Sequence, residues 1–462
     1  ARVAVLLALV VLLLIATPFV LWAYNVERAG QLMERGLAWA EPRYVDTLPV
    51  AHDRGALEDA LGHLAAAMRW RPDHEYPYRL AGQIYTARGE WLQAAESYEQ
   101  ARLRAPDNPL LAWEAGLVYE QMIEIVEQGE RRPIVTELAA GQVIAPDVPI
   151  STPFCTSEPG SCYVAETTFA LPYASESNGP TLTTPTLFMH PPARVRQQLS
   201  VPADLPALTF LLGLHPAAHG WGSDGASFQI WVEAAGQPGR LIYERTLDAA
   251  TDVQGWVAGG ADLSPWAGQS VTLVIGAAPG PTGDAAGDWY GVGDVAFTSL
   301  EAAHYISFTP QVGLRESWRS GGFAPSDLLA RGDRARFRQR YDESLVWYER
   351  AGRMDLLEST VWYYRYRTYK AQGQTEMAVN ALQRAVRSNK GWISTEAQAR
   401  AHLLWGIELF NQEQHEQATQ AFLKTLVLGT GDPAVHAVAS ESYRFLGAIH
   451  WRRGELAEAH QN

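Results

Sequence analysis

The sequence predicts a multidomain protein with α and β structure: a transmembrane helix, two α-helical repeat arrays, and an antiparallel β-sandwich between the arrays. Three observations lead to this prediction: an uncharged apolar run near the N-terminus, a period of 34 residues at both ends of the chain, and a middle region of alternating apolar and polar residues. The chain has 462 residues, of which 47% are hydrophobic and 19% charged. This composition supports several packed domains and excludes a disordered or collagen-like chain.

A run of residues without charge extends over 3–23 and predicts a single membrane-spanning helix. At 1.5 Å per residue this run would be about 31 Å long, which matches the hydrocarbon core of a bilayer. Trp22 and Tyr24 stand at its end, where aromatic rings favour the membrane interface. A cleaved signal peptide is the alternative, although its apolar region is usually only about 7 to 15 residues long. We therefore assign residues 1–25 to a single-pass anchor in the cell membrane.

The two cysteines indicate on which side of the membrane most of the chain lies. Cys155 and Cys162 enclose the turn-forming residues Thr-Ser-Glu-Pro-Gly-Ser and are candidates for a disulfide. Disulfides persist in oxidising compartments, so this pair favours an extracytoplasmic location for the bulk of the protein. Two unrelated free thiols are the alternative. Zinc is disfavoured because no second cysteine pair or suitably spaced histidine pair accompanies them.

The period of 34 residues predicts one helical array over 26–128 and another over 325–462. Small residues such as Gly82 recur at positions where two antiparallel helices must pack closely. In the second array the spacing stretches to about 40 residues around Gly406, which implies longer turns between helices there. The recurring sets are Ala60, Leu64, Ala67 and Pro72 with Ala94, Tyr98, Ala101 and Pro106, and Ser344, Tyr348 and Ala351 with Ala378, Leu382 and Ala385.

This pattern resembles the tetratricopeptide repeat, whose unit is a helix-turn-helix of 34 residues. The resemblance implies solenoids in which the first helix of each pair lines a concave groove that binds extended peptides or partner helices. Arginine and aromatic side chains in the groove suit an acidic segment or a C-terminal carboxylate, and packing against neighbouring repeats is the alternative. Because Asn462 falls within the second helix of a unit, we expect the protein to continue beyond it. The matching groove positions are Tyr76, Arg79, Gln83, Tyr363, Arg367, Lys370, Phe410, Arg444 and Trp451.

Between the arrays, residues 146–305 lose the helical period and become rich in Gly, Pro, Thr and alternating apolar residues. Linkers are predicted on either side, over 129–145 and 306–324. Short segments rich in strand-forming residues, each bounded by turn residues, predict an antiparallel β-sandwich. The predicted strands are 164–171, 195–201, 208–214, 227–233, 241–247, 271–275 and 292–299.

Within this region, Ser-Phe-Gln-Ile-Trp-Val at 227–232 and Gly-Asp-Trp-Tyr-Gly-Val at 287–292 stand in an order that resembles the galactose-binding-like jelly rolls, which include carbohydrate-binding modules. The resemblance implies sugar binding at loops, where aromatic rings stack on the sugar and polar groups orient it. The candidate glycan platform consists of Trp221, Trp289 and Tyr290, because glycine and aspartate flank them. Burial in the core or at a sheet edge is the alternative for these aromatic residues.

Acidic and histidine residues of the middle region give weaker indications of a metal site. Asp284, Asp288 and Asp294 could supply oxygen ligands to a structural calcium ion, although their spacing matches no EF-hand loop, and solvated carboxylates are the alternative. His215 and His219 are four residues apart, but a proline and a glycine beside them disfavour the helix that would direct both toward zinc. We therefore interpret them as loop histidines and expect no other cofactor.

The sequence also limits the classes of function. A formal net charge of -14 argues against nucleic acid as a partner. The chain has no phosphate-binding loop, no Gly-x-Ser-x-Gly elbow and no His-Glu-x-x-His motif, so we predict no enzymatic activity. We expect a membrane-anchored extracytoplasmic scaffold whose repeats bind partner proteins or copies of itself, with glycan contact by the β-sandwich. The alternatives are a structural subunit of a larger membrane or cell-surface assembly and a surface glycan-binding protein.

Overall fold

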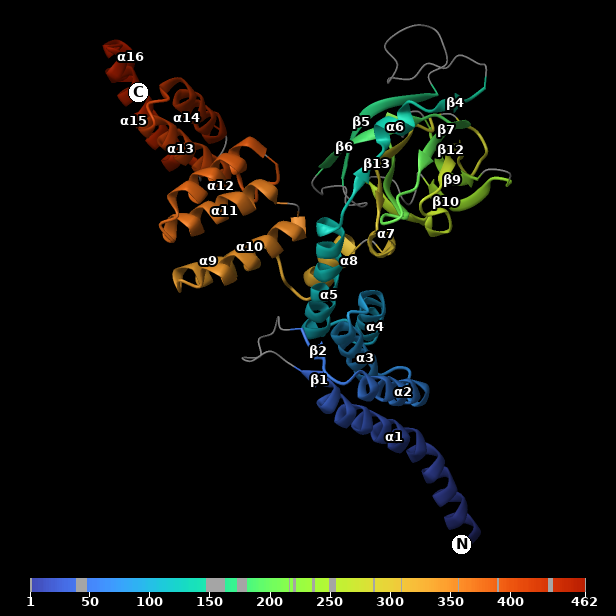
Figure 1. Ribbon diagram of the computed structural model, residues 1–462. Coiled ribbons are helices and arrows are strands. Elements are labelled where there is room, and N and C mark those ends of the chain that lie inside the picture. Colours follow the sequence, from blue (N-terminus) through green and yellow to red (C-terminus); the bar gives the residue numbers. More distant parts are fainter. Residues whose placement is uncertain are drawn as a thin grey trace. The chain divides into compact units, whose positions relative to one another are not determined.

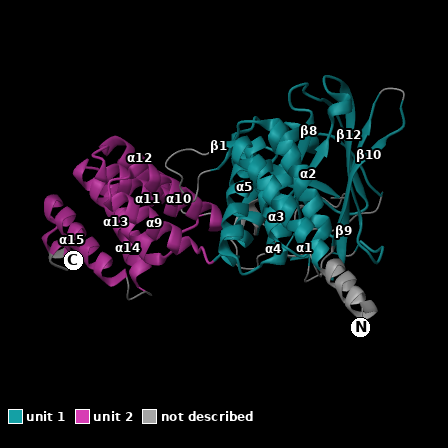
Figure 2. Ribbon diagram, turned by 90° about the horizontal axis from the view of Figure 1, so that it is seen from below, with its two compact units in different colours: residues 1–321 teal, residues 322–462 magenta. Residues whose placement is uncertain are grey.

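The computed structural model forms two compact units, residues 1–321 and residues 322–462 (Figure 2). It combines α-helices with antiparallel β-sheets, as the sequence predicts. Among the residues that the structure describes, no helix has the length and apolar character that a membrane crossing requires, so the predicted span is not supported. The described residues are 2–38, 48–146, 163–172, 181–215, 217–218, 222–234, 237–248, 255–285, 287–308, 310–355, 357–388, 390–430 and 435–461.

The chain begins with a single helix, α1 (Arg2–Gly36), which has no break at the predicted boundary of residue 25. Its second half packs against α2 (Arg54–Trp70) through a shared core. Asn25 and His63 join the two helices by a hydrogen bond between Oδ1 and Nδ1 of 2.9 Å. The second half of α1 thus serves as the first helix of a repeat. The core shared by α1 and α2 contains Ala29, Leu32, Met33, Leu57, Ala60 and Leu64. Between the two helices, β1 (Leu37–Ala38) and β2 (Val50–Ala51) form a two-stranded ribbon.

The next repeat consists of α3 (Tyr76–Arg88) and α4 (Trp91–Arg104). Gly89 ends α3 in the left-handed conformation, with φ of 75°, which glycine adopts without strain. A Cβ atom on Gly82 would lie 2.9 Å from the Tyr98 ring, so the absence of a side chain lets the two helices approach. The 34-residue pattern therefore reflects the packing of a small residue on one helix against a large residue on the other.

The third repeat is divided by the β-sandwich. Its first helix is α5 (Pro109–Gln128), and its second helix is α8 (Pro310–Ser320), which lies within the predicted linker 306–324. Gly116 of α5 faces the Trp318 indole, and Gly313 of α8 faces the Tyr119 ring. These two contacts run in opposite directions along the helices, so α5 and α8 form an antiparallel pair like that of α3 and α4.

The β-sandwich has two antiparallel sheets, one in the order β10-β9-β12-β7-β4 and the other in the order β11-β8-β13-β6-β5, with β3 paired to β13 (Figure 1). All seven predicted strands are present. The strands are β3 (Arg132–Pro133), β4 (Gln142–Ile144), β5 (Val164–Pro172), β6 (Thr181–Met189), β7 (Ala193–Ser200), β8 (Ala207–Leu214), β9 (Gly225–Glu233), β10 (Arg240–Asp248), β11 (Val257–Asp262), β12 (Ser270–Pro279) and β13 (Tyr290–Thr298).

Strands β6 and β11 were not predicted from the sequence, and their composition explains why. Strand β6 contains four threonines and is interrupted by Pro185 before its short apolar end, and β11 is Val-Ala-Gly-Gly-Ala-Asp with two glycines at its centre, so neither shows the apolar pattern of a strand over its length. The predicted linker 129–145 also belongs to the sandwich, because it supplies β3, β4 and the short helix α6 (Val135–Ala139). Short elements of this kind are recognised only by their partners in the tertiary structure.

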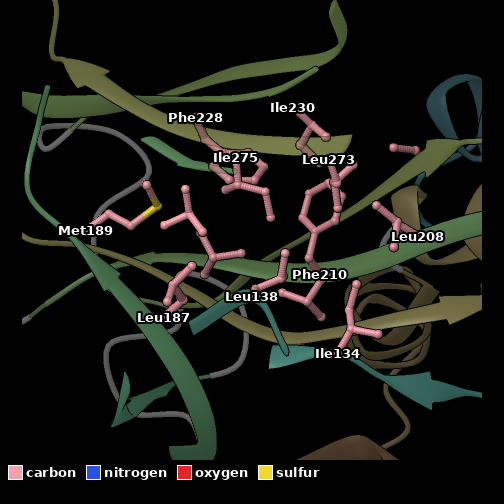
Figure 3. Packing of buried hydrophobic residues seen from close by; sticks show 14 of the residues in the cluster. Ile134, Leu138, Leu187, Met189, Leu208, Phe210, Phe228, Ile230, Leu273 and Ile275 are labelled. Carbon is pink, nitrogen blue, oxygen red and sulfur yellow. The ribbon is translucent and has the colours of Figure 1, made fainter. Parts of the chain in front are cut away.

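The core of the sandwich lies between the two sheets (Figure 3). Strand β9 alternates as predicted, with Phe228 and Ile230 pointing inward. Helix α6 closes one side of the core with Leu138. Helix α7 (Leu300–Ser307) packs on β11 and on α5 and so connects the sandwich to the third repeat. Further core residues labelled in Figure 3 are Ile134, Leu187, Met189, Leu208, Phe210, Leu273 and Ile275.

The second unit contains helix pairs that repeat the design of the first array. A Cβ atom on Gly332 would lie 2.3 Å from the Tyr348 ring, and one on Gly406 would lie 2.5 Å from the Phe422 ring. The lengthened turn before α13 is held by Thr360, whose Oγ1 accepts a 2.8 Å hydrogen bond from the Ile393 amide. The helices are α9 (Pro325–Phe337), α10 (Tyr341–Asp355), α11 (Glu358–Ala371), α12 (Thr375–Ser388), α13 (Thr395–Asn411), α14 (His415–Gly429), α15 (His436–Arg453) and α16 (Leu456–Gln461).

Candidate binding faces of the repeats and the sandwich

The candidate groove residues of the second unit lie on the first helices of its repeats, α11, α13 and α15. On α11, Tyr363 is buried and packs against Trp392, with ring centroids 6.2 Å apart. Arg367 forms a 3.2 Å ion pair with Asp333 of α9, and its guanidinium lies 4.8 Å from the centroid of Tyr364. Burial opposes the charge of Arg367, but the Asp333 carboxylate and the neighbouring tyrosines together outweigh this effect, and the pKa of the guanidinium is raised. These two groove residues therefore join α11 to its neighbours.

Of the other predicted residues of this unit, Lys370, Arg444 and Trp451 remain at the surface, and Phe410 is half-buried against the core. Lys370 forms a 3.5 Å pair with Glu408, and Arg444 forms a 3.2 Å pair with Glu441, all with solvent access. Exposed pairs of this kind contribute only about 0 to 1 kcal/mol, so a ligand carboxylate can replace them at small cost. Trp451 is 70% exposed, an unusual position for a large aromatic residue.

Aromatic and arginine side chains of α13 and α15 form a continuous cluster at this surface. Phe410 lies against Phe445 with centroids 5.5 Å apart, and the guanidinium of Arg452 lies 4.4 Å from the Phe410 centroid. The guanidinium of Arg444 lies 4.6 Å from the Phe445 centroid. Arg452 was not among the predicted residues, although it follows Trp451 directly. We call Phe410, Arg444, Trp451 and Arg452 the α13–α15 patch.

In the first unit, two of the three predicted groove residues are bound to a neighbouring repeat. Arg79 donates from Nε and Nη2 to the two carboxylate oxygens of Glu114, both at 2.8 Å. Gln83 donates to the same carboxylate at 3.1 Å. The hydrogen bond to Glu114 is the main cause that raises the pKa of Arg79. A carboxylate of the chain thus occupies the position predicted for a ligand carboxylate, and Tyr76 remains exposed.

Two of the three residues of the predicted glycan platform, Trp289 and Tyr290, are buried in the sandwich. Tyr290 is fully buried and stacks on Phe228 with centroids 5.7 Å apart, and burial raises the pKa of its hydroxyl well above the usual value. Trp289 is only 5% exposed. Because neither ring is open to solvent, these two residues offer no surface for stacking on a sugar. Trp221 lies outside the described residues.

The sandwich instead carries an aromatic ring on the outer face of β9. Trp231 points outward because its neighbours Ile230 and Val232 point into the core. The Arg194 guanidinium lies 4.8 Å from the Trp231 centroid. Gly276 stands on the adjacent strand, and a Cβ atom there would lie 2.8 Å from the indole, so glycine makes room for the ring. The alternation of β9 was the sequence signal for this position.

Two of the predicted calcium ligands, Asp288 and Asp294, bind other groups of the protein. Asp288 is fully buried and accepts hydrogen bonds from Ser223 Oγ at 2.7 Å and from the Gly280 amide at 3.3 Å. Burial raises the pKa of Asp288 to about 6. Asp294 forms a 2.9 Å pair with Arg131. Within the described part of the chain, no group of three or more acidic, histidine or cysteine residues could hold a metal ion.

The remaining predicted residues carry little further information. His215 Nδ1 accepts a 3.2 Å hydrogen bond from the Ala217 amide, as expected for a loop histidine, and burial lowers its pKa. His219 lies outside the described residues, and so do both members of the predicted disulfide, Cys155 and Cys162. The structure therefore leaves the pairing of the cysteines as a prediction from the sequence.

No model of a known protein family and no curated protein matches the sequence. Among solved structures, the chain is similar to MamA, with a TM-score of 0.23, 17% identity, and coverage of 34% of this chain and 85% of the other. It is also similar to a CBM51 module of GH95 from Clostridium perfringens, solved with methyl-galactose, with a TM-score of 0.23, 13% identity, and coverage of 37% and 100%. A structure from Clostridium perfringens ZmpB, with CBM51-2 in complex with GlcNAc and INT domains, gives a TM-score of 0.24, 12% identity, and coverage of 51% and 44%. Similarities of this size carry no functional argument.

Proposed function

We propose that the protein is a scaffold that binds segments of partner proteins on the first helices of its second repeat array. The observation that carries this proposal is the α13–α15 patch, in which α15 carries an exposed tryptophan, Trp451, and directly after it Arg452, whose guanidinium lies over the Phe410 ring. Tryptophan and arginine are the residues that contribute most to binding energy at protein interfaces. The patch accepts an acidic segment or a C-terminal carboxylate, because its cations are arginines and its rings offer stacking surfaces.

The test uses the full chain and a displayed library of peptides with varied charge and varied C-termini. We expect enrichment of acidic peptides, with binding lost in the double variant Trp451→Ala, Arg452→Glu. The matched control is Val346→Ala, because Val346 is also an exposed apolar residue but lies on α10, the second helix of its pair. Peptides without acidic preference, or equal binding by the double variant and the control, would contradict the proposal.

A second candidate function is glycan contact by the sandwich, and Trp231 is the observation that favours it. An outward ring on a sheet, with Gln229 and Glu233 on the same face of β9, provides stacking and polar contacts together. On a glycan array, Trp231→Ala should abolish sugar binding while Trp451→Ala leaves it unchanged. The peptide assay should show the reverse. A sugar that binds both variants equally well excludes the Trp231 face as its site.

The location at the membrane stays a prediction, and we propose that the uncharged run 3–23 attaches the chain to a bilayer from the extracytoplasmic side. Supporting the proposal is the continuity of α1, which carries this run directly into the first repeat. Flotation of the full chain with lipid vesicles on a density gradient tests the attachment. Sedimentation of the whole protein away from the vesicles would exclude it.

A further inference from the structure

One end of the first repeat array exposes several large apolar side chains. They come from α1, from the last residue of α2, from the first residue of α3 and from the end of α4. Their exposed fractions range from 39% to 73%. An exposed apolar cluster on a folded domain marks a contact with a partner or a membrane. We call this set the apolar edge, and it consists of Phe19, Val20, Trp70, Tyr76 and Leu103.

Side-chain contacts join α1 and α4 to the turn between α2 and α3. The guanidinium of Arg71 lies 5.0 Å from the centroid of Phe19 and 5.3 Å from that of Trp22. On the other side of the turn, Arg104 donates a hydrogen bond to the Pro72 carbonyl, and its guanidinium lies 3.8 Å from the Tyr78 centroid. These contacts place Phe19 of α1 and the end of α4 at the same turn, which follows Trp70 and precedes Tyr76.

The composition of this surface suits the interface of a bilayer. Tryptophan and tyrosine favour the level of the lipid headgroups, and arginine places its apolar stem along the hydrocarbon and its charge in the headgroup layer. Arg69 and Arg104 supply cationic side chains at the ends of α2 and α4, and Arg71 shares its charge with Asp73 at 3.7 Å. Anionic headgroups would complement these arginines.

The position of the edge on α1 decides between a lipid surface and a protein partner. Arg71, which follows the last residue of α2, contacts Phe19, so the part of α1 before Phe19 leaves the array at this edge. That part of the sequence, from Val3 to Pro18, has no charged residue. We infer that the apolar edge rests on the headgroup layer of a lipid bilayer and fixes the first repeats against the membrane surface. This inference rests on the proposed attachment through residues 3–23.

The experiment places a photoreactive p-benzoylphenylalanine at Trp70, Tyr76 or Leu103, one position at a time, in the full chain reconstituted in vesicles of phosphatidylcholine and phosphatidylglycerol. The matched control position is Val50, which is also exposed but pairs with Ala38, just beyond the C-terminal end of α1 and away from Phe19. After irradiation, mass spectrometry should detect lipid adducts at the three edge positions and none at Val50.

Each contrary outcome has a separate meaning. If the chain floats with the vesicles but the edge positions give no more lipid adducts than Val50, the edge does not contact lipid and the inference is overturned, while the attachment stands. Protein adducts in place of lipid adducts at the edge also overturn the inference, because they identify a protein contact. If the unsubstituted chain does not float, the proposed attachment fails and the inference fails with it.

Discussion

Gly116 of α5 and Trp318 of α8 interlock although the whole β-sandwich lies between them in the sequence. A Cβ atom at position 116 would lie only 1.6 Å from the indole nitrogen of Trp318, so only glycine lets the two helices meet. Trp318 is fully buried and also stacks on Trp113, 205 residues earlier, with centroids 5.1 Å apart. The third repeat is therefore a complete helix pair whose connecting turn is replaced by a domain.

Gly116→Ala should destabilise the first unit by about 3 kcal/mol, at the upper end of the cost of an overpacked core. The control is Gly62→Ala in α2, where a Cβ atom would meet no atom within 4 Å. That variant should gain up to about 1 kcal/mol, because alanine favours a helix over glycine. Urea unfolding followed by tryptophan fluorescence measures both changes. Equal stabilities of the two variants would show that α5 and α8 do not pack as described.

The second unit should lose stability in mild acid because of His402. Burial, followed by the nearby charge of Lys424, lowers the pKa of this histidine to about 4 from an ordinary value near 6.5. The unfolded chain then binds a proton that the folded chain does not, so the stabilisation is complete above about pH 6.5 and is lost as the pH falls to about 4. The loss is on the order of 3 kcal/mol.

His402→Gln should flatten this dependence on pH, whereas His436→Gln, which changes an exposed histidine at the start of α15, should leave it intact. Unfolding in urea at several pH values between about 4 and 7 measures the slope. The same slope in both variants would assign the acid sensitivity to another group.

The pairing of Glu114 with Arg79 should contribute to the packing of the second repeat against the third. Glu114→Ala leaves Arg79 and Gln83 without their shared acceptor, and both side chains are largely removed from solvent. We expect a loss of about 1 to 3 kcal/mol, the usual cost of an unsatisfied buried polar group. Lys370→Ala, which removes an exposed pair, should cost no more than about 1 kcal/mol. A double-mutant cycle with Arg79→Ala checks the coupling, and additive effects would exclude it.

Tyr290→Phe distinguishes a core residue from a sugar platform. Within the described part of the chain, the buried hydroxyl of Tyr290 has no hydrogen-bond partner, so its removal should leave stability unchanged or raise it by about 1 kcal/mol. Tyr348→Phe provides the contrast, because the Tyr348 hydroxyl donates a 2.9 Å hydrogen bond to Asp333. That variant should lose about 1 kcal/mol. Thermal unfolding compares the two, and a marked loss of stability in Tyr290→Phe would reveal a partner for its hydroxyl.

Patterns that act over a few turns of chain were readable in the sequence. Gly82 and Tyr98 stand in the same repeat, so their spacing predicts the helix pair, and the same spacing joins Gly332 to Tyr348. The alternation of Phe228, Ile230 and Val232 likewise predicts strand β9 and its inner face. Each of these signals is local, because helical and strand periodicities are set by neighbouring residues.

The candidate binding residues were predicted as positions on the first helices, but their partners could not be predicted from the sequence. Arg79 and Arg367 lie on the helices assigned to them, yet each is paired with a carboxylate of another repeat. Lys370 and Arg444 were predicted in the same way, from their positions on first helices, but their ion pairs remain exposed to solvent. Burial depends on which helix packs next, and that information is absent from a single helical period.

Local patterns were sufficient to assign helical repeats to both ends of the chain and a β-sandwich to the middle, but they missed the elements within the predicted linkers 129–145 and 306–324. The contacts between distant segments added that Trp318 completes the repeat begun by Gly116, that Tyr290 lies in the core, and that Gly276 on the neighbouring strand makes room for the Trp231 ring. The physical reason is that secondary structure follows from local periodicity, whereas burial and pairing follow from contacts between residues far apart in the chain.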